Sequence, residues 1–279
     1  MDPAELDLRI VPLHRVLLHE GHDPHGVARM VMALEHDGML RHPPIVTQLD
    51  TDPDEPLYVV LDGATRTTAL RKMGSRDILV QVVDYASPHV SLSAWNHLLQ
   101  GIAPEDLLAQ IHNVPGAHVV ETDTHHADAA LAVRQLLCYF ILRDHSVWGV
   151  RADGDLAAQT EVLNQVVNVY RGHAELFRVV TTQLDLLLHE YPEMMALVVF
   201  PRYSPAEVLH LALSNAKVPM GITRHLIGGR VLNVTVALET LMSDEPLAQK
   251  NACLQDWLRQ KVHARKVRFY GEPLFVIEE

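Results

Sequence analysis

The clearest chemical pattern in the sequence is a short apolar run that leads directly into Asp62 and Gly63 and then into a helix-forming segment. Glycine lets a backbone approach a ligand closely, and the first amides of a helix have no partner inside the helix. The amides of Ala64, Thr65 and Arg66 are therefore expected to point beyond the strand end, where the helix dipole attracts an anion. The pattern predicts a phosphate-binding site.

Two side chains at this junction indicate what such a site would do. Arg66 falls in the first expected helical turn, where a cation opposes the helix dipole unless an anion is bound beside it. Asp62 could hold Mg²⁺ or orient a hydroxyl group. An aspartate cap followed by a solvated arginine would have the same spacing, and the sequence alone leaves both interpretations open.

Glu20 is a second candidate, in the segment HEGHD between the first expected strand and the first expected helix. A loop at that position could bring this carboxylate to the same end of the fold as Asp62. Two carboxylates near a phosphate site suit phosphoryl transfer, in which one accepts a hydroxyl proton and the other holds a metal ion. An ordinary polar loop is the alternative.

Thr223, Arg224 and His225 form a third candidate group, shortly after a Pro-Met-Gly turn. If these residues begin a helix, their amides and side chains would form a receptor for a carboxylate or a phosphate. Trp95 lies among polar residues and could line a pocket, although a single aromatic residue is also common in a core. A structural turn and a core tryptophan remain the alternatives.

Short strands and helices are expected to position these residues in an α+β fold. Apolar, β-prone runs predict strands at residues 8–12, 44–48, 57–61, 78–85 and 196–200. Apolar periodicity and capping residues predict a helix that begins at Pro24 after an Asp23 cap and ends at Gly38, and further helices at 64–72, 104–112, 155–170, 204–212 and 251–261. We expect a compact unit over residues 1–86, packed against a second, mixed α/β part over residues 87–279.

Other segments give mixed signals. A β-hairpin is expected from residues 130–142 and 145–150, where large apolar and aromatic residues flank a polar pair. Helices are expected at 174–190 and 231–241, with a loop over 219–230 between them. A last strand is expected at 274–277.

The composition argues against several classes of protein. The 279 residues include 35 acidic and 23 basic ones, so the net charge of −12 repels nucleic acid and anionic membranes on average. Neither a signal peptide nor a spanning segment is evident, so we expect a cytoplasmic protein. Two distant cysteines match no zinc or disulfide framework. The 18 histidines are scattered and suit surface and loop positions, although pairs such as His22/His25 and His125/His126 could bind a metal ion. A basic run over 259–268 keeps a DNA-binding function open.

The order of these motifs resembles a known family. The HEGHD loop, the strand PPIV and the segment YVVLDGATRTTAL look like the N-terminal domain of the ParB/sulfiredoxin superfamily, and most like its free L-serine kinases. The segment GITRH in the C-terminal part is similar to the same branch. The chain departs from sulfiredoxin because no cysteine precedes Arg66. It departs from partition ParB because GATR replaces the GERR nucleotide box and no helix-turn-helix is evident.

This resemblance implies a small-molecule phosphotransferase that moves a phosphoryl group from ATP or ADP, with Mg²⁺, to free L-serine and forms O-phospho-L-serine. It implies that the nucleotide phosphates rest on residues 62–66, that Glu20 is the general base and that Asp62 is a catalytic residue that assists with the metal ion or the nucleophile. Serine would lie between the two parts of the chain, held by Thr223, Arg224 and His225 with Trp95 as a wall. The alternative is a ParB-like, nucleotide-dependent DNA-binding or regulatory protein without kinase activity.

Overall fold

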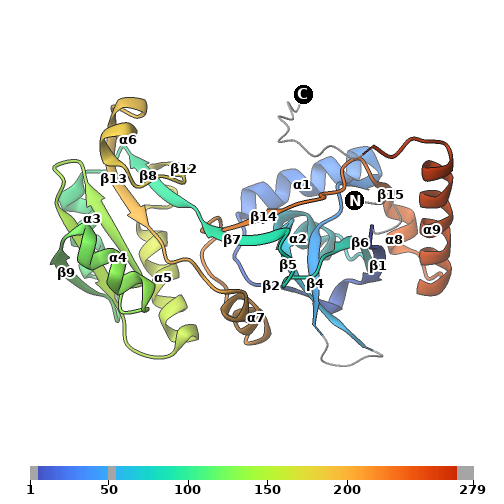
Figure 1. Ribbon diagram of the computed structural model, residues 1–279, viewed down its shortest axis with the longest axis horizontal. Coiled ribbons are helices and arrows are strands. Elements are labelled where there is room, and N and C mark those ends of the chain that lie inside the picture. Colours follow the sequence, from blue (N-terminus) through green and yellow to red (C-terminus); the bar gives the residue numbers. More distant parts are fainter. Residues whose placement is uncertain (1–5, 50–54, 269–279) are drawn as a thin grey trace. The chain divides into compact units, whose positions relative to one another are not determined.

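The computed structural model describes residues 6–49 and 55–268, which form two compact units. The first unit contains the described residues 6–16, 24–49, 55–90 and 227–268, and the second contains 17–23 and 91–226. In Figure 1 the helices α1, α2, α8 and α9 belong to the first unit, and α3 to α7 belong to the second. The chain therefore enters the second unit at residues 17–23, leaves the first unit again after residue 90 and returns to it after residue 226, whereas the sequence-based division assigned all of residues 87–279 to one part.

A mixed sheet forms the centre of the first unit. Its order is β1-β6-β4-β5-β2, with β1 at Leu8–Pro12, β2 at Val16–Leu18, β4 at Ile45–Leu49, β5 at Leu57–Asp62 and β6 at Asp77–Val82. β4 is antiparallel to β5 and parallel to β6. Ile45 pairs with Asp62 on one side and with Gln81 on the other, so Asp62 and Gln81 lie at the same end of the sheet.

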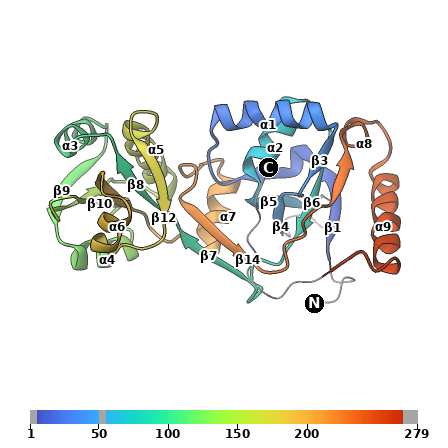
Figure 2. The ribbon, with the colours of Figure 1, turned by 90° about the horizontal axis from the view of Figure 1, so that it is seen from above.

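Helices cover this sheet. Figure 2 shows α1 (Pro24–Asp37) and α2 (Ala64–Lys72) together on one side of it, and α9 (Leu247–His263) packs against β1. Gly38 has a φ of 63° and ends α1, as the sequence predicts. The described part of the unit also contains a 3₁₀ turn (Leu13–Arg15), the antiparallel pair β3 (Met39–Arg41) and β15 (Thr235–Ala237), and α8 (Leu238–Met242).

The second unit is built around a larger antiparallel sheet. Its order is β12-β8-β13-β10-β11-β9, with β8 at Asn96–Gln100, β9 at His118–Thr122, β10 at Cys138–Leu142, β11 at Val147–Arg151, β12 at Glu175–Val179 and β13 at Met194–Val199. In Figure 2, α3 (Pro104–His112) and α5 (Leu156–Tyr170) lie on one side of this sheet, and α4 (Thr124–Ala132) and α6 (Leu184–Glu190) on the other. Buried side chains of α4, α6 and the strands form one apolar core between these layers.

Local side-chain signals determine where two helices of the second unit begin. The carboxylate of Asp155 accepts a hydrogen bond from the amide of Ala158 and caps α5. Ser204 and Glu207 form a reciprocal capping box at the start of α7 (Pro205–Leu213). Both helix starts are where the sequence predicts them, because the capping residue and the helix it caps are adjacent in the chain.

The structure corrects several expectations for the second half of the chain. The helix expected at 174–190 begins only at Leu184, because the preceding residues form β12 and pair with β8. The expected loop at 219–230 contains β14 (Thr223–Ile227), which pairs with β7 (Val90–Ala94). The helix expected at 231–241 is reduced to α8, because the residues before it pair with β3. In each case pairing with a distant strand outweighs the local preference for a helix or a loop.

Two further expectations have different outcomes. The hairpin across residues 143 and 144 is confirmed as β10 and β11, although its first strand starts at Cys138 because residues 130–132 belong to α4. The strand expected at 274–277 lies outside the described residues. Within the described ranges, no helix combines the length and the apolar character that a membrane-spanning helix needs.

Candidate active site

The junction of β5 and α2 has the geometry that the sequence predicts for an anion site. Gly63 takes a left-handed conformation with a φ of 100°, and a Cβ added there would lie 2.9 Å from the Cβ of Pro44. Only glycine fits such a position without strain. Gly63 has no side chain, so the N-cap residue does not compete with an anion for the first amides of α2.

Asp62 lies between two arginine side chains at this junction. Its Oδ2 atom is 2.7 Å from Nη1 of Arg230 and 3.3 Å from Nη2 of Arg66. Arg66 also donates a hydrogen bond to the carbonyl of His42, so its guanidinium is held from two sides. Arg230 is not among the residues predicted for this junction, because 168 positions separate it from Asp62 in the chain.

Gln81 explains how Arg230 reaches the junction. The side-chain amide of Gln81 donates to the carbonyl of Gly229 over 2.9 Å and accepts from the amide of Val231 over 3.0 Å. Gln81 is buried and lies at the same end of the sheet as Asp62. Because its side chain holds both neighbours of Arg230 in the chain, it places Arg230 at that end of the sheet. No local pattern in the sequence indicates this contact.

The junction fits a magnesium ion that arrives with a nucleotide. Proteins usually hold such an ion through one or two carboxylates together with the phosphates of the substrate. Asp62 supplies one carboxylate, and its Oδ1 atom accepts no hydrogen bond from the described residues. In the described part of the chain, no group of three His, Cys, Asp or Glu side chains is placed to hold a metal ion alone. A metal ion at Asp62 would therefore need phosphate oxygens as further ligands.

Glu20 lies in a separate cluster, in the second unit. Its Oε2 atom accepts a hydrogen bond of 2.9 Å from the hydroxyl of Thr223 and lies 3.4 Å from the amide nitrogen of Gly221. The backbone on either side of Glu20 is bonded to that of Val218, with N···O distances of 2.8 and 2.9 Å. The structure thus joins two of the residues predicted from sequence, Glu20 and Thr223, in one cluster.

His19 is a buried member of this cluster to which the sequence analysis assigned no role. Its Nε2 atom is 3.0 Å from the hydroxyl oxygen of Thr223, and its ring centre is 5.4 Å from that of His225. A threonine hydroxyl has a single proton. Because Thr223 donates this proton to Glu20, the Nε2 atom of His19 must carry a hydrogen and donate it to Thr223. These bonds orient the carboxylate of Glu20.

The side chains of the third candidate group lie on two opposite faces of β14. Thr223 and His225 share one face with His19, since alternate residues of a strand point the same way. Arg224 points to the other face, where its guanidinium carbon lies 4.6 Å from the ring centre of Trp95. Because these residues form a strand, the free helix-start amides expected for them are absent, which corrects the sequence-based prediction.

The turn that carries Gly221 is held at its carbonyl by His97. The Nε2 atom of His97 lies 3.4 Å from the carbonyl oxygen of Gly221, and Nδ1 lies 2.8 Å from the hydroxyl of Tyr170. Burial, together with the charges of Arg178 and Arg171, lowers the pKa of His97 to about 3, although the hydrogen bond to Gly221 opposes this shift. His97 is therefore neutral at ordinary pH, donates to Gly221 and accepts from Tyr170.

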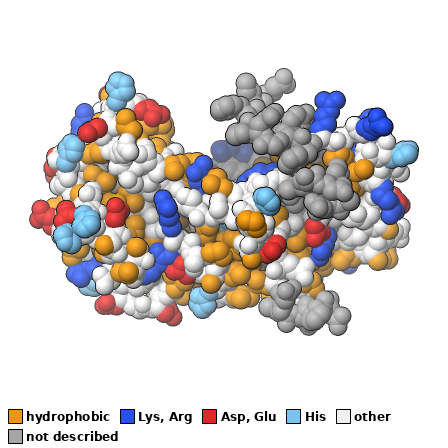
Figure 3. All heavy atoms as spheres, viewed as in Figure 1, with side chains coloured by type: hydrophobic (Ala, Val, Ile, Leu, Met, Phe, Trp, Pro, Cys, Tyr) orange, Lys and Arg blue, Asp and Glu red, His pale blue; other side chains and the backbone are white. Residues whose placement is uncertain are grey.

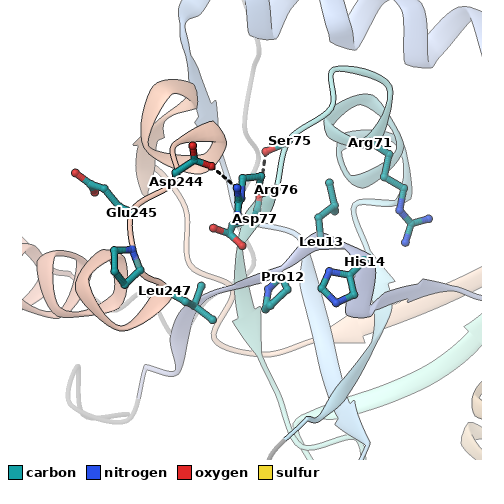
Figure 4. Close-up of a pocket in the computed structure, with 11 residues that line it drawn as sticks. Pro12, Leu13, His14, Arg71, Ser75, Arg76, Asp77, Asp244, Glu245 and Leu247 are labelled. Carbon is teal, nitrogen blue, oxygen red and sulfur yellow. Dashed lines mark hydrogen bonds and ion pairs between the residues drawn. The ribbon is translucent and has the colours of Figure 1, made fainter.

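A pocket of about 680 Å³ opens elsewhere in the first unit. Figure 4 shows charged side chains of both signs around it, with Asp244 turned toward Arg76, its ion-pair partner. Asp77, another lining residue, begins β6, whereas Asp62 lies at the opposite end of the same sheet. The lining contains none of the residues that the sequence predicts for the site.

The chain has the fold of the free serine kinases. A solved structure described as free serine kinase in complex with AMP has a TM-score of 0.72 and 18% identity, and the match covers 85% of this chain and 94% of that one. An alanine mutant of a free serine kinase in complex with ADP has a TM-score of 0.72 and 17% identity, covering 84% and 94% of the two chains. SbnI from Staphylococcus aureus with a C-terminal truncation has a TM-score of 0.68 and 24% identity, covering 92% and 97%.

Sequence similarity extends along almost the whole chain. The ATP-dependent L-serine kinase SbnI of Staphylococcus aureus is 26% identical over an aligned length of 278 residues, and the match covers 98% of this chain and 97% of that protein. An ATP-dependent L-serine kinase of Staphylothermus marinus is 23% identical over 230 residues, covering 78% of this chain and 84% of that protein. The chain matches no family model. The resemblance to free L-serine kinases is thus confirmed.

Proposed function

We propose that this protein is a kinase that transfers the terminal phosphoryl group of ATP to the hydroxyl of free L-serine and forms O-phospho-L-serine. The observation that carries this proposal is the similarity, from end to end, to a protein named as an ATP-dependent L-serine kinase. Both relatives are named as ATP-dependent, which favours ATP over ADP as the donor. The first unit then corresponds to the expected ParB/sulfiredoxin-like nucleotide-binding domain.

In this proposal the first unit holds the nucleotide phosphates. The amides that follow Gly63 receive phosphate oxygens, and Arg66 adds positive charge beside them. Arg230 contributes a second guanidinium through its contact with Asp62. Mg²⁺, held by Asp62 and the phosphates, would neutralise the charge that develops on the transferred group.

The second unit supplies the base in this proposal. Glu20 accepts the proton of the serine hydroxyl, so the hydroxyl oxygen can attack the terminal phosphorus atom. The hydroxyl of Thr223 and the amide of Gly221 keep the carboxylate in one orientation. His225 lies on the same face of β14 and lines the serine site, whereas Trp95 and Arg224 support β14 from its other face.

The DNA-binding alternative depends on the basic stretch at 259–268. Arg259 of this stretch forms an ion pair with Asp256, and the ammonium of Lys261 lies 5.3 Å from the ring centre of Trp257. On the face seen in Figure 3, acidic side chains and histidines lie among the lysines and arginines of the described residues. Together with the net charge of −12, this mixture of signs favours the kinase.

The direct test is to incubate the full chain with ATP, Mg²⁺ and L-serine and to look for O-phosphoserine by mass spectrometry. We expect O-phosphoserine and ADP in equal amounts, and a parallel incubation with ADP measures the second donor. If no O-phosphoserine forms with either donor, the proposed function is wrong. A salt-dependent shift of duplex DNA by the same preparation would then support the alternative.

Arg66→Ala tests the phosphate site. We expect the KM for ATP to rise by about 10-fold or more, because a charge-assisted contact to phosphate is lost, while the KM for serine changes little. Steady-state kinetics and the melting temperature are measured together. Arg41→Ala is the matched control, because Arg41 is an exposed arginine of the same unit that pairs with Asp37. An unchanged KM for ATP with a large drop in melting temperature would make Arg66 structural.

Thr223→Val and Thr223→Ser together test the orientation of Glu20. Valine has nearly the same shape but no hydroxyl, so we expect Thr223→Val to lower kcat by about 10- to 100-fold. Serine keeps the hydroxyl between His19 and Glu20, so Thr223→Ser should retain most of the activity. Equal losses in both variants would indicate that the methyl group matters and the hydroxyl does not.

A further inference from the structure

Arg178, in β12, is a charged residue near the Glu20 cluster for which the proposed mechanism has no role. It is exposed, and its guanidinium forms no hydrogen bond or ion pair with any described residue. Its charge nevertheless acts on this cluster, because it contributes to the low pKa of His97. A guanidinium presents a planar fork of donors that matches the two oxygens of a carboxylate.

The guanidinium of Arg178 packs against the backbone of Gly221. A Cβ added to Gly221 would overlap with the Nε, Cζ and Nη2 atoms of Arg178. The φ of Gly221 is 76°, which is a left-handed conformation that favours glycine. The missing side chain at this position therefore makes room for the cation beside the amide that faces Glu20.

The separation of Arg178 and Glu20 does not exceed the length of a bound amino acid. The guanidinium touches Gly221, whose nitrogen is 3.4 Å from Oε2 of Glu20, so cation and carboxylate are no more than about 9 Å apart. A serine between them would span about 9 Å, with about 2.8 Å for each of two hydrogen bonds and about 3.5 Å between its hydroxyl and carboxylate oxygens. A serine whose hydroxyl contacts Glu20 thus has its carboxylate within reach of Arg178.

Two other arginines of the second unit are already engaged. Arg171 donates a hydrogen bond of 3.2 Å to the carbonyl of Met220. Arg224 is stacked on Trp95, on the face of β14 that points away from Thr223. Arg178 is therefore better placed than either of them to receive a second charged group of a substrate whose hydroxyl lies at Glu20.

We propose that Arg178 binds the carboxylate of the substrate and thereby makes the enzyme specific for a free α-amino acid. This inference rests on the proposed serine kinase function. The hydroxyl of the substrate is recognised at Glu20 and the carboxylate at Arg178, so an amino alcohol that lacks the carboxylate loses one of the two contacts.

The test compares three small molecules. L-Serine has both groups, L-alanine keeps the carboxylate but lacks the hydroxyl, and ethanolamine keeps the hydroxyl but lacks the carboxylate. In Arg178→Ala we expect the KM for L-serine and the inhibition constant of L-alanine to rise by about 10- to 100-fold. Ethanolamine, followed as a substrate or as a competing ligand, should be unaffected. Arg178→Lys keeps the charge without the planar fork and should restore only part of the affinity.

Arg151→Ala is the matched control, because Arg151 is exposed, ends β11 of the same sheet and has a side chain that forms no hydrogen bond or ion pair with the described residues. It should change none of the three constants. The inference is wrong if Arg178→Ala affects L-serine and ethanolamine by the same factor, or leaves the constant for L-alanine unchanged. A selective loss in Arg224→Ala instead would assign the carboxylate to that arginine.

The failure of this inference can be told apart from the failure of the proposed function. If the wild-type protein forms no O-phosphoserine, the proposed function is wrong. Calorimetry of L-alanine binding to the wild type and to Arg178→Ala still tests the carboxylate site in that case. Tight binding to the wild type that is lost in the variant supports the site, and equal or absent binding in both overturns it.

Discussion

Glu20→Gln is expected to lower kcat for serine phosphorylation by about 10²- to 10⁴-fold, which is the usual contribution of a general base. The amide has nearly the same shape and its oxygen can still accept the hydrogen bond from Thr223, so the cluster keeps its geometry. The amide cannot, however, accept the proton of the serine hydroxyl. The measurement is kcat at saturating serine and ATP, together with the calorimetric affinity for ATP, which should stay within about twofold of the wild-type value.

The matched control for this prediction is Glu121→Gln, because Glu121 is an exposed glutamate in β9 of the same unit. It removes the same charge and should leave kcat unchanged. A Glu20→Gln variant with near-normal kcat at saturating substrate would show that another group takes the proton. Loss of both kcat and the folded state would call for Glu20→Asp, which keeps a carboxylate and should recover part of the activity.

Lys250→Met is expected to lower the free energy of unfolding of the first unit by about 3–5 kcal/mol. The side chain of Lys250 is fully buried, and its ammonium lies 2.7 Å from the carboxylate of Asp77 and 2.8 Å from the carbonyl of Ser243. Methionine fills a similar volume but leaves the carboxylate of Asp77, which is 12% exposed, without its cation. This contact joins α9 to the first residue of β6.

Urea denaturation followed by circular dichroism measures this effect. Arg259→Met on the same helix removes an exposed cation that pairs with Asp256 and should cost less than about 1 kcal/mol. Adding Asp77→Asn to Lys250→Met removes the uncompensated charge and should restore part of the stability. If Lys250→Met is no more destabilising than Arg259→Met, the buried pair does not stabilise the fold.

The β5–α2 junction could be predicted from the sequence because its signals are local. The apolar run, the glycine and the helix-forming residues follow one another, so Asp62, Gly63 and Arg66 lie at the predicted strand end. The same holds for α5 and α7, whose caps are adjacent to the helices that they start. Short-range hydrogen bonds and backbone preferences are sufficient for such features.

The sequence also predicted Glu20 and Thr223 as candidates, but each by itself. Their hydrogen bond joins residues that are 203 positions apart, and no pattern of residue types indicates that they meet. The partner that completes this cluster, His19, precedes Glu20 in the same motif, yet its role depends on the contact with Thr223. The chemistry of single residues was thus accessible from the sequence, and their combination was not.

Only the tertiary structure decided which charged groups face one another. Pairing with β7 makes residues 223–227 a strand, and strand alternation then turns Arg224 away from Thr223. Arg230 comes to Asp62 through bonds made by a buried glutamine, and Arg178 comes to Gly221 because β12 pairs with β8. Backbone propensity acts over a few residues, whereas these contacts depend on hydrogen bonds and burial that two distant segments provide only when they pack together.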